Sequence, residues 1–166
     1  MTETSYRLRP EEAADEAFLR RLYASSRAGE LGMLGWSPAQ LETFLEMQFN
    51  ARARSYSERY PEAEKLVILV GEEPAGRLFL NRTEAGIGIV DIALLPEHRG
   101  GGIGARLIAG LQAEGAAAGQ AVVLSVEAGN PAARLYGRLG FQLSGGDGVY
   151  QAMAWLPEPA GAVAGR

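Results

Sequence analysis

The chain of 166 residues is long enough for one domain, with 47% hydrophobic residues, 22% charged residues and a net charge of −4. It has no cysteine, one histidine (His98) and one lysine (Lys65), which excludes a cysteine nucleophile, a disulfide framework, a cysteine zinc site and a cluster of histidine ligands. We therefore expect no metal site, and the scattered arginines lack the clustering that nucleic-acid binding needs.

The sequence also bears on compartment and domain organisation. No apolar run approaches the roughly 18–20 residues of a membrane span, and the polar, acidic start is atypical of a signal peptide. We expect a cytoplasmic protein that binds neither nucleic acid nor membrane. The last ten residues, 157–166, are small and rich in proline and glycine, which predicts a flexible tail after a single domain over residues 1–156.

The first part of the chain predicts a short strand and two helices. The strand covers Tyr6–Arg9, and apolar residues at helical spacing follow from Glu11 to about Gly29. A second helix begins at Ser37, a capping residue followed by proline at the first helical position, and continues to about Tyr60.

The rest of the chain predicts a run of strands followed by two strand–helix units. Helices follow the glycine-rich turn Arg99–Gly104 and the pair Asn130-Pro131, and the second of them ends at Gly140. The expected strands are Lys65–Val70, Ala75–Asn81, Gly86–Leu95, Ala121–Val126, Phe141–Leu143 and Gly148–Trp155, with turns at Glu72–Pro74 and Arg82–Ala85. This order predicts an α/β fold of the α+β type, with one mixed sheet covered by helices.

The segment Val90–Ala105, VDIALLPEHRGGGIGA, has a strand that leads into glycines, and the glycines open a helix. Glycines let the backbone approach a ligand closely, and the first helical turn offers unpaired N–H groups at a positive dipole end. Such a turn can hold an anion, above all a phosphate. The alternative is a glycine-rich connection that binds nothing.

This segment does not match well either of two other known phosphate-binding loops, the Walker A loop and the Rossmann fingerprint. A Walker A loop needs Lys-Ser/Thr after its last glycine, and Gly104 is followed by Ala105-Arg106. The permissive Rossmann fingerprint fits Gly100, Gly102 and Ala105, with Glu127 at the end of the next strand. However, Pro96–Arg99 separates strand from glycine, and too little chain follows Glu127 for a doubly wound sheet. A dinucleotide-binding oxidoreductase is therefore the weakest alternative.

Two motifs in the same order resemble the GNAT acyltransferase superfamily. Arg99-x-x-Gly102-x-Gly104 matches the family's Arg/Gln-x-x-Gly-x-Gly/Ala signature, and the strand residues before it are similar too. The segment Asn130–Phe141, NPAARLYGRLGF, resembles the second family motif, Asn-x-x-Ala-x-x-x-Tyr-x-x-x-Gly-Phe. The resemblance covers Lys65–Trp155 well and is looser before it.

The resemblance implies a mostly antiparallel sheet of about six or seven strands, splayed at an acyl-CoA site. Acetyl-CoA would be the cosubstrate, with its pyrophosphate on the glycine loop and its pantetheine arm along the strand before it. Backbone N–H groups of that strand would also polarise the thioester carbonyl. The residues implied in this site are Ile92, Ala93, Leu94, Arg99, Gly100, Gly101, Gly102, Ile103, Gly104, Ala105, Asn130, Ala133 and Tyr136.

Two residues are candidates for proton transfer. Tyr136 matches the family position of the general acid that protonates the departing thiolate, although an aromatic on an amphipathic helix can be purely structural. Asp91 lies in the strand beside the thioester site and is a candidate base or water-orienting carboxylate. Alternatively, Asp91 faces away or only orients backbone groups. Asn130, which precedes a proline, can cap a helix as well as bind pantetheine.

The helix from Ser37 carries a clue to the acceptor site. On a helical wheel, Gln48 and Arg52 fall in the middle of its apolar face, where polar groups are costly unless hydrogen-bonded. They form either a structural network, with Arg52 beside a carboxylate, or a polar pocket wall. The residues that we expect around the acceptor are Glu30, Trp36, Gln48, Arg52, Tyr56 and Tyr150.

The resemblance thus implies an N-acetyltransferase in which a primary amine of a small molecule or peptide attacks the thioester directly. Direct attack needs no nucleophile from the protein and fits a chain without cysteine. The competing interpretation is a catalytically idle acyl-CoA-binding module that senses or regulates. The family resemblance is also compatible with a homodimer.

Overall fold

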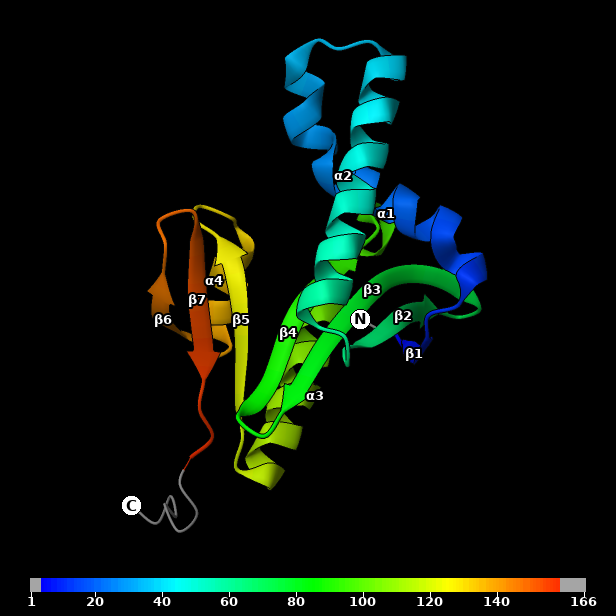
Figure 1. The fold of residues 1–166 in the computed structure, drawn as a ribbon. Coiled ribbons are helices and arrows are strands. Elements are labelled where there is room, and N and C mark those ends of the chain that lie inside the picture. The colour runs from blue at the N-terminus through cyan, green and yellow to red at the C-terminus, as the bar shows by residue number, and fades with distance from the viewer. Residues whose placement is uncertain (1–3, 159–166) are drawn as a thin grey trace. The chain divides into compact units, whose positions relative to one another are not determined.

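A computed structural model describes residues 4–158, and its helices and strands are labelled in Figure 1. The strands are β1 (Arg7–Pro10), β2 (Glu64–Val70), β3 (Glu73–Thr83), β4 (Gly86–Leu94), β5 (Ala121–Glu127), β6 (Gln142–Gly146) and β7 (Tyr150–Trp155). The α-helices are α1 (Glu16–Leu31), α2 (Pro38–Arg59), α3 (Ile103–Ala118) and α4 (Ala132–Arg138), and short 3-10 turns lie at η1 (Ala13–Asp15), η2 (Gly32–Leu34) and η3 (Pro96–His98). None of these helices is long and apolar enough to cross a membrane.

Within the described chain, the strands form a seven-stranded sheet in the order β1-β2-β3-β4-β5-β7-β6. The pairs β1–β2, β5–β7 and β6–β7 are antiparallel, and β4–β5 is parallel. The parallel register extends from Gly86↔Ala121 to Ile89↔Leu124, and both strands continue beyond it. The prediction of a mixed, mostly antiparallel sheet flanked by helices is confirmed.

Several element boundaries differ from the predicted ones, among them the turn between β2 and β3 and the start of α1. The turn between β2 and β3 lies at Gly71 and Glu72 rather than at Glu72–Pro74, because Gly71 adopts a left-handed φ of 62° that closes the turn early. The helix expected from Glu11 begins as η1 and becomes α-helical at Glu16. The predicted tail starts at Pro157, and its residues 159–166 lie outside the described part of the chain.

The described residues pack into two compact units. The first comprises Met1–Phe79 and Asp91–Gly101, and the second comprises Leu80–Val90 and Gly102–Arg166, in both cases as far as the chain is described. The apolar core of the first unit contains Phe18, Leu19 and Leu22 of α1, Val67 and Leu69 of β2, and Leu95. This core fixes α1 on the strands of its own unit.

A buried carboxylate joins β1 to the start of α1. Asp15 accepts hydrogen bonds from both terminal nitrogens of Arg9, each at 2.8 Å, and from the backbone N–H of Glu12 at 2.7 Å. The hydrogen bond from Arg9, together with that from Glu12, outweighs burial and holds the pKa of Asp15 below its usual value. The bidentate pair therefore stays ionised at neutral pH and fixes the angle at which the chain enters the helix.

Helix α2 begins where the sequence predicts and presents one half-buried face. Ser37 Oγ accepts from the Gln40 N–H at 3.2 Å, and Gln40 Oε1 accepts from the Ser37 N–H at 2.9 Å, which forms a capping box. None of the residues of α2 is fully buried. The half-buried positions follow helical spacing and place Gln48 and Arg52 among the apolar side chains, as the wheel predicts: Leu41, Phe44, Leu45, Gln48, Phe49, Arg52, Ser55 and Tyr56.

In the second unit, α3 contacts β5 and buries its apolar face. Strand β5 is an inner strand of the sheet, between β4 and β7, yet its burial alternates and Val123 is 43% exposed. Strand β6 starts at Gln142 and extends to Gly146 instead of ending at Leu143, with a register shift between Leu143 and Gly145.

The close approach of β3 to β4 at Gly76 yields a stability prediction. A Cβ atom on Gly76 would lie 2.2 Å from the Ala93 carbonyl oxygen, so Gly76→Ala must displace backbone. We expect it to lower the free energy of unfolding by about 2–3 kcal/mol in urea denaturation. The control Gly110→Ala, in α3 with open space around it, should raise stability by about 0.5–1 kcal/mol. Equal stability of Gly76→Ala and wild type would contradict the close approach.

Candidate functional site

The glycine loop between η3 and α3 has the backbone conformation of an anion-binding turn. Gly100 and Gly102 adopt left-handed φ values of 82° and 81°, which L-residues with side chains rarely take. Gly102 is the N-cap of α3, and in residues 4–158 no side chain caps this helix. The N–H groups of its first turn have no partner within the helix and stand at the positive end of its dipole. They can therefore bind a phosphate oxygen.

Two contacts in the first unit hold the start of this loop. Arg99, implied as a coenzyme residue, donates from Nε to the Leu94 carbonyl oxygen at 3.0 Å and so ties the loop to the end of β4. Thr4 lies against Gly101, because a Cβ on that glycine would be 3.0 Å from Thr4 Oγ1. No motif in the sequence indicates this contact, since it joins the start of the chain to a loop far along it.

The strand expected to bind pantetheine is half-buried. Asp91, Ile92, Ala93 and Leu94 are all partly exposed, whereas the earlier part of β4 is mostly buried. Partial exposure leaves this stretch of backbone accessible to a ligand. The assignment of Ile92–Leu94 to the coenzyme stays a prediction.

The second motif lies in the second unit. Asn130 Oδ1 accepts from the Ala132 N–H at 2.9 Å, and its backbone carbonyl accepts from the Ala133 N–H at 3.0 Å, so Asn130 shapes the start of α4. The side chain of Tyr136 is buried, with its residue 8% exposed, and its ring centroid is 6.0 Å from that of Phe141. The structural role expected of Asn130 is thus present, while the coenzyme role of both residues stays a prediction.

Arg52 forms a structural network with a carboxylate, which is one of the two alternatives that the sequence left open for it. Its Nη2 lies 2.8 Å from Asp91 Oδ2, and its Nε donates to Tyr56 Oη at 2.9 Å. Its guanidinium also lies over the rings of Tyr23 and Tyr56, with centroid distances of 5.2 Å and 5.1 Å. Arg52 therefore links α1, α2 and β4 of the first unit.

The same network shifts two pKa values. Burial is the largest single effect on Arg52 and opposes its charged form, but the Asp91 carboxylate, together with Tyr56 and Tyr23, outweighs burial and raises the pKa of Arg52 above its ordinary value. Burial, and then the Asp91 charge, raise the pKa of Tyr56 despite the opposing effect of Arg52. At neutral pH the guanidinium is therefore charged and the phenol keeps its proton.

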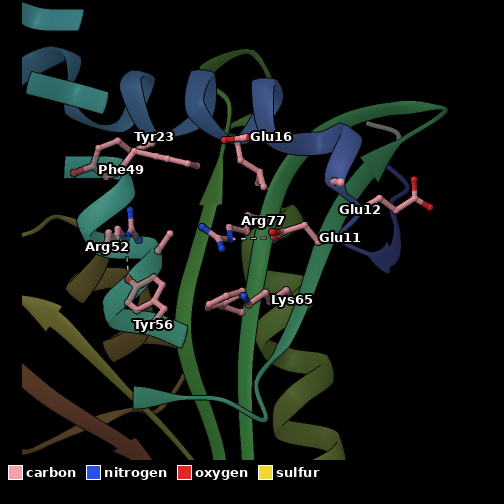
Figure 2. Close-up of a pocket in the computed structure, with 13 residues that line it drawn as sticks. Glu11, Glu12, Glu16, Tyr23, Phe49, Arg52, Tyr56, Lys65 and Arg77 are labelled. Atoms are coloured by element: carbon pink, nitrogen blue, oxygen red, sulfur yellow. Dashed lines mark hydrogen bonds and ion pairs between the residues drawn. The ribbon is translucent and has the colours of Figure 1, made fainter. Parts of the chain in front are cut away.

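Arg52 and Tyr56 also line a cavity of about 260 Å³ in the first unit, shown in Figure 2. The cavity lies among η1, the two helices α1 and α2, and the strands β2 and β3. It combines carboxylates, cationic groups and aromatic rings. Its lining residues are Glu11, Glu12, Ala13, Glu16, Leu19, Tyr23, Phe49, Arg52, Ala53, Tyr56, Lys65, Arg77 and Phe79.

The cavity contains a buried ion pair that the sequence analysis missed. Arg77 Nε lies 3.5 Å from Glu11 Oε2, and neither atom has a hydrogen-bond partner in the described structure. The Arg77 guanidinium lies 4.1 Å from the Phe79 ring centroid. An arginine inside the apolar strand segment Ala75–Leu80 is the sequence signal that could have found this site.

The lining of this cavity does not include the other residues expected around the acceptor. Glu30 is exposed and pairs with Arg27 at 3.1 Å, and Gln48 is half-buried on α2 but does not line the cavity. Trp36 packs edge-on against Phe44 at 5.2 Å and lines a separate, uncharged hollow of about 490 Å³. Tyr150 is 48% exposed on β7 of the second unit. Of the six residues expected around the acceptor, Arg52 and Tyr56 contact each other and line the cavity.

The Arg52–Asp91 pair predicts energetic coupling. We expect Arg52→Gln and Asp91→Asn each to lower the free energy of unfolding by about 1–3 kcal/mol, because each leaves a partly buried charge without its partner. The double variant should lose less than the sum of the two, by about 1 kcal/mol. The exposed pair Arg7–Glu72 serves as the control, with coupling near zero in the same denaturation experiment. Additivity at Arg52 and Asp91 would contradict the contact.

Comparisons with known proteins agree with the motifs and the sheet order. Residues 62–143 match the family model described as an acetyltransferase (GNAT) domain. Comparison with curated proteins found no match. Among solved structures, the PaiA N-acetyltransferase of Thermoplasma acidophilum in complex with coenzyme A aligns with a TM-score of 0.68 and 18% identity, over 92% of this chain and 99% of that one.

Two further structures show the same fold. The ribosomal-protein-S18-alanine N-acetyltransferase of Escherichia coli aligns with a TM-score of 0.61 and 18% identity, over 96% of this chain and 99% of that one. An acetyltransferase of Thermus thermophilus aligns with a TM-score of 0.64 and 19% identity, over 93% of this chain and 99% of that one. Together, the family model and the two motifs identify residues 62–143 of this chain as a GNAT acetyltransferase domain, and the shared fold agrees with that assignment.

Proposed function

We propose that the protein transfers the acetyl group of acetyl-CoA to a primary amine of a small molecule or peptide. The observation that carries this proposal is the loop from Arg99 to Gly104, with left-handed glycines at positions 100 and 102 and an uncapped helix after it, inside the region that matches the GNAT model. A fold neighbour whose structure contains coenzyme A supports the choice of cosubstrate.

The proposed coenzyme site uses mainly the backbone. The first-turn N–H groups of α3 bind the pyrophosphate, and the main chain of Ile92–Leu94 pairs with the pantetheine arm. Hydrogen bonds from that strand also stabilise the negative charge that develops on the thioester oxygen. The side-chain oxygen of Asn130 accepts from the Ala132 N–H at the start of α4, which leaves the side-chain amide N–H groups to bind pantetheine.

The proposed transfer needs two proton movements. The amine nitrogen forms a bond to the acyl carbon and loses a proton, while the carbon–sulfur bond breaks and the thiolate takes up a proton. Tyr136 donates its proton to the leaving thiolate. A phenol has an ordinary pKa of about 10 and a thiol of about 8.5, and the negative charge that builds up on the sulfur as the carbon–sulfur bond breaks attracts the proton. The burial of Tyr136 supports a defined position for its hydroxyl.

Asp91 completes the proposed chemistry on the acceptor side. An amine with a pKa of about 10.4 is mostly protonated at neutral pH, so its proton needs an exit route. Of the two roles considered for Asp91, base or water-orienting carboxylate, the ion pair with Arg52 favours orientation, because it already fixes one carboxylate oxygen. The other oxygen can hold a water molecule that carries the proton to solvent.

The loop assignment predicts a specific loss of coenzyme affinity. Gly102→Ala places a side chain on a left-handed N-cap, and the resulting shift of the first-turn N–H groups should weaken acetyl-CoA binding at least about tenfold. Gly119→Ala is the matched control, because Gly119 has a φ of 67° at the other end of α3. It should lose comparable stability and keep wild-type affinity in calorimetry. Equal affinity of the two variants would exclude the loop, and wild-type protein that binds no acetyl-CoA would overturn the function.

The acid role of Tyr136 predicts a defect in turnover alone. Tyr136→Phe should reduce kcat by about 10²–10⁴-fold, because a general acid is lost, while the affinity for acetyl-CoA stays unchanged. Thiol release measured across an amine panel checks this, with Tyr60→Phe as a control that removes a phenol outside the proposed site. Unchanged turnover would remove Tyr136 from the mechanism. Tight coenzyme binding with no amine acetylated by wild type would favour the idle binding module.

A further inference from the structure

We propose that the cavity of about 260 Å³ binds a free amino acid with an apolar side chain, at a site separate from acetyl transfer. The proposal concerns the first unit alone and does not depend on the acceptor of the transfer reaction.

The cavity is lined by one side chain of each charge, Glu11 and Arg77, which form an ion pair too long to be a good hydrogen bond. Glu11 Oε2 and Arg77 Nε are both buried, lie 3.5 Å apart and have no hydrogen-bond partner in the described structure. Leaving charged groups buried without hydrogen bonds is costly. Because Oε2 and Nε are closed off against each other, a ligand in the cavity would use the rest of the two lining side chains. A ligand with both an ammonium and a carboxylate would donate to the second carboxylate oxygen of Glu11 and accept from the terminal nitrogens of Arg77. A ligand with one charge would satisfy only one of them.

Both groups are held in place before any ligand arrives. The backbone N–H of Glu11 donates to the Lys65 carbonyl oxygen at 2.9 Å, which ties this residue to β2. Arg77 lies in the middle of β3, and its guanidinium lies 4.1 Å from the centre of the Phe79 ring. In Figure 2 the two side chains extend toward each other. Groups that are already ordered lose little conformational entropy on binding.

The remaining walls and the volume define the rest of the ligand. Leu19, Tyr23, Phe49, Tyr56 and Phe79 give the cavity an apolar and aromatic lining around the ion pair. Its volume equals the liquid volume of about nine water molecules and is below the roughly 300–1,000 Å³ of pockets for drug-sized ligands. A single amino acid with an aliphatic side chain has the matching combination of charges, apolar group and small size.

The lining also separates this cavity from the strand expected to hold the thioester. It includes neither Asp91 nor Ile92–Leu94, and Arg52 is the lining residue that pairs with Asp91. An amino acid bound between Glu11 and Arg77 therefore has its amine engaged by a carboxylate inside the cavity. We infer that the amino acid is bound there and is not acetylated there.

Calorimetry on the full chain with L-valine, L-leucine and L-methionine tests the site. At least one of them should bind with one-to-one stoichiometry. Two derivatives of that amino acid should each bind at least about tenfold more weakly: the N-acetyl derivative, which lacks the ammonium, and the amide, which lacks the carboxylate. Glu11→Gln, which keeps the side-chain volume, should weaken binding of the amino acid by a similar factor. Arg77→Gln should do the same where circular dichroism shows it folded. Glu72→Gln, which removes an exposed carboxylate outside the cavity, is the matched control.

Three results would overturn the inference. The first is that none of the three amino acids binds to wild type at millimolar concentrations. The second is that Glu11→Gln binds as tightly as Glu72→Gln, which would place any binding elsewhere. The third is that mass spectrometry after incubation with acetyl-CoA finds the bound amino acid converted to its N-acetyl form. Recovery of the unmodified amino acid supports the separate site. This result does not bear on the proposed acetyl transfer, which the variants of Gly102 and Tyr136 test independently.

Discussion

The ion pair between Arg52 and Asp91 adds a polar attachment to the partial apolar burial of α2, in which Phe49 packs against the core of the first unit. This helix has no fully buried residue along its 22 positions, so its half-buried face alone provides a limited hydrophobic contribution. Arg52 instead contacts a carboxylate of β4, a phenol of its own helix and an aromatic ring of α1. The placement of α2 beside β4 therefore depends on the ion pair, the hydrogen bond and the ring contact that the single guanidinium of Arg52 makes at the same time.

The two proposed binding sites, the glycine loop and the cavity, differ in how far the sequence reveals them. Binding of a pyrophosphate relies on backbone N–H groups, which need a loop conformation that glycine allows. The spacing of these glycines, such as Gly100 and Gly102, can be read directly from the sequence. Recognition by the cavity relies on side chains from helices and strands far apart in the sequence. Glu11 and Arg77 meet only after β1, β2 and β3 have paired, and no local spacing announces that meeting.

The fold shows the same division between local and non-local information. The start of α2 at Ser37 and the glycine turn before α3 follow from local chemistry, and both were predictable. The position of β7 between β5 and β6 was not, because it depends on pairing across the sheet rather than on the strand's own residues. The wheel placed Arg52 on the inner face of its helix, but only the fold identified Asp91 as its partner.

The contact of Thr4 with Gly101 has a consequence for evolution. Because a Cβ at position 101 would lie 3.0 Å from Thr4 Oγ1, the side chains that the two positions can hold are sterically linked. Homologues with alanine or a larger residue at the loop position should carry glycine or alanine at the position of Thr4, or lack a segment that packs there. In those with threonine at the first position, a side chain at the second requires the threonine hydroxyl to move by a few tenths of an ångström, so glycine should be favoured there. Covariation between the start of the chain and its glycine loop is thus an expected signature of this branch of the superfamily.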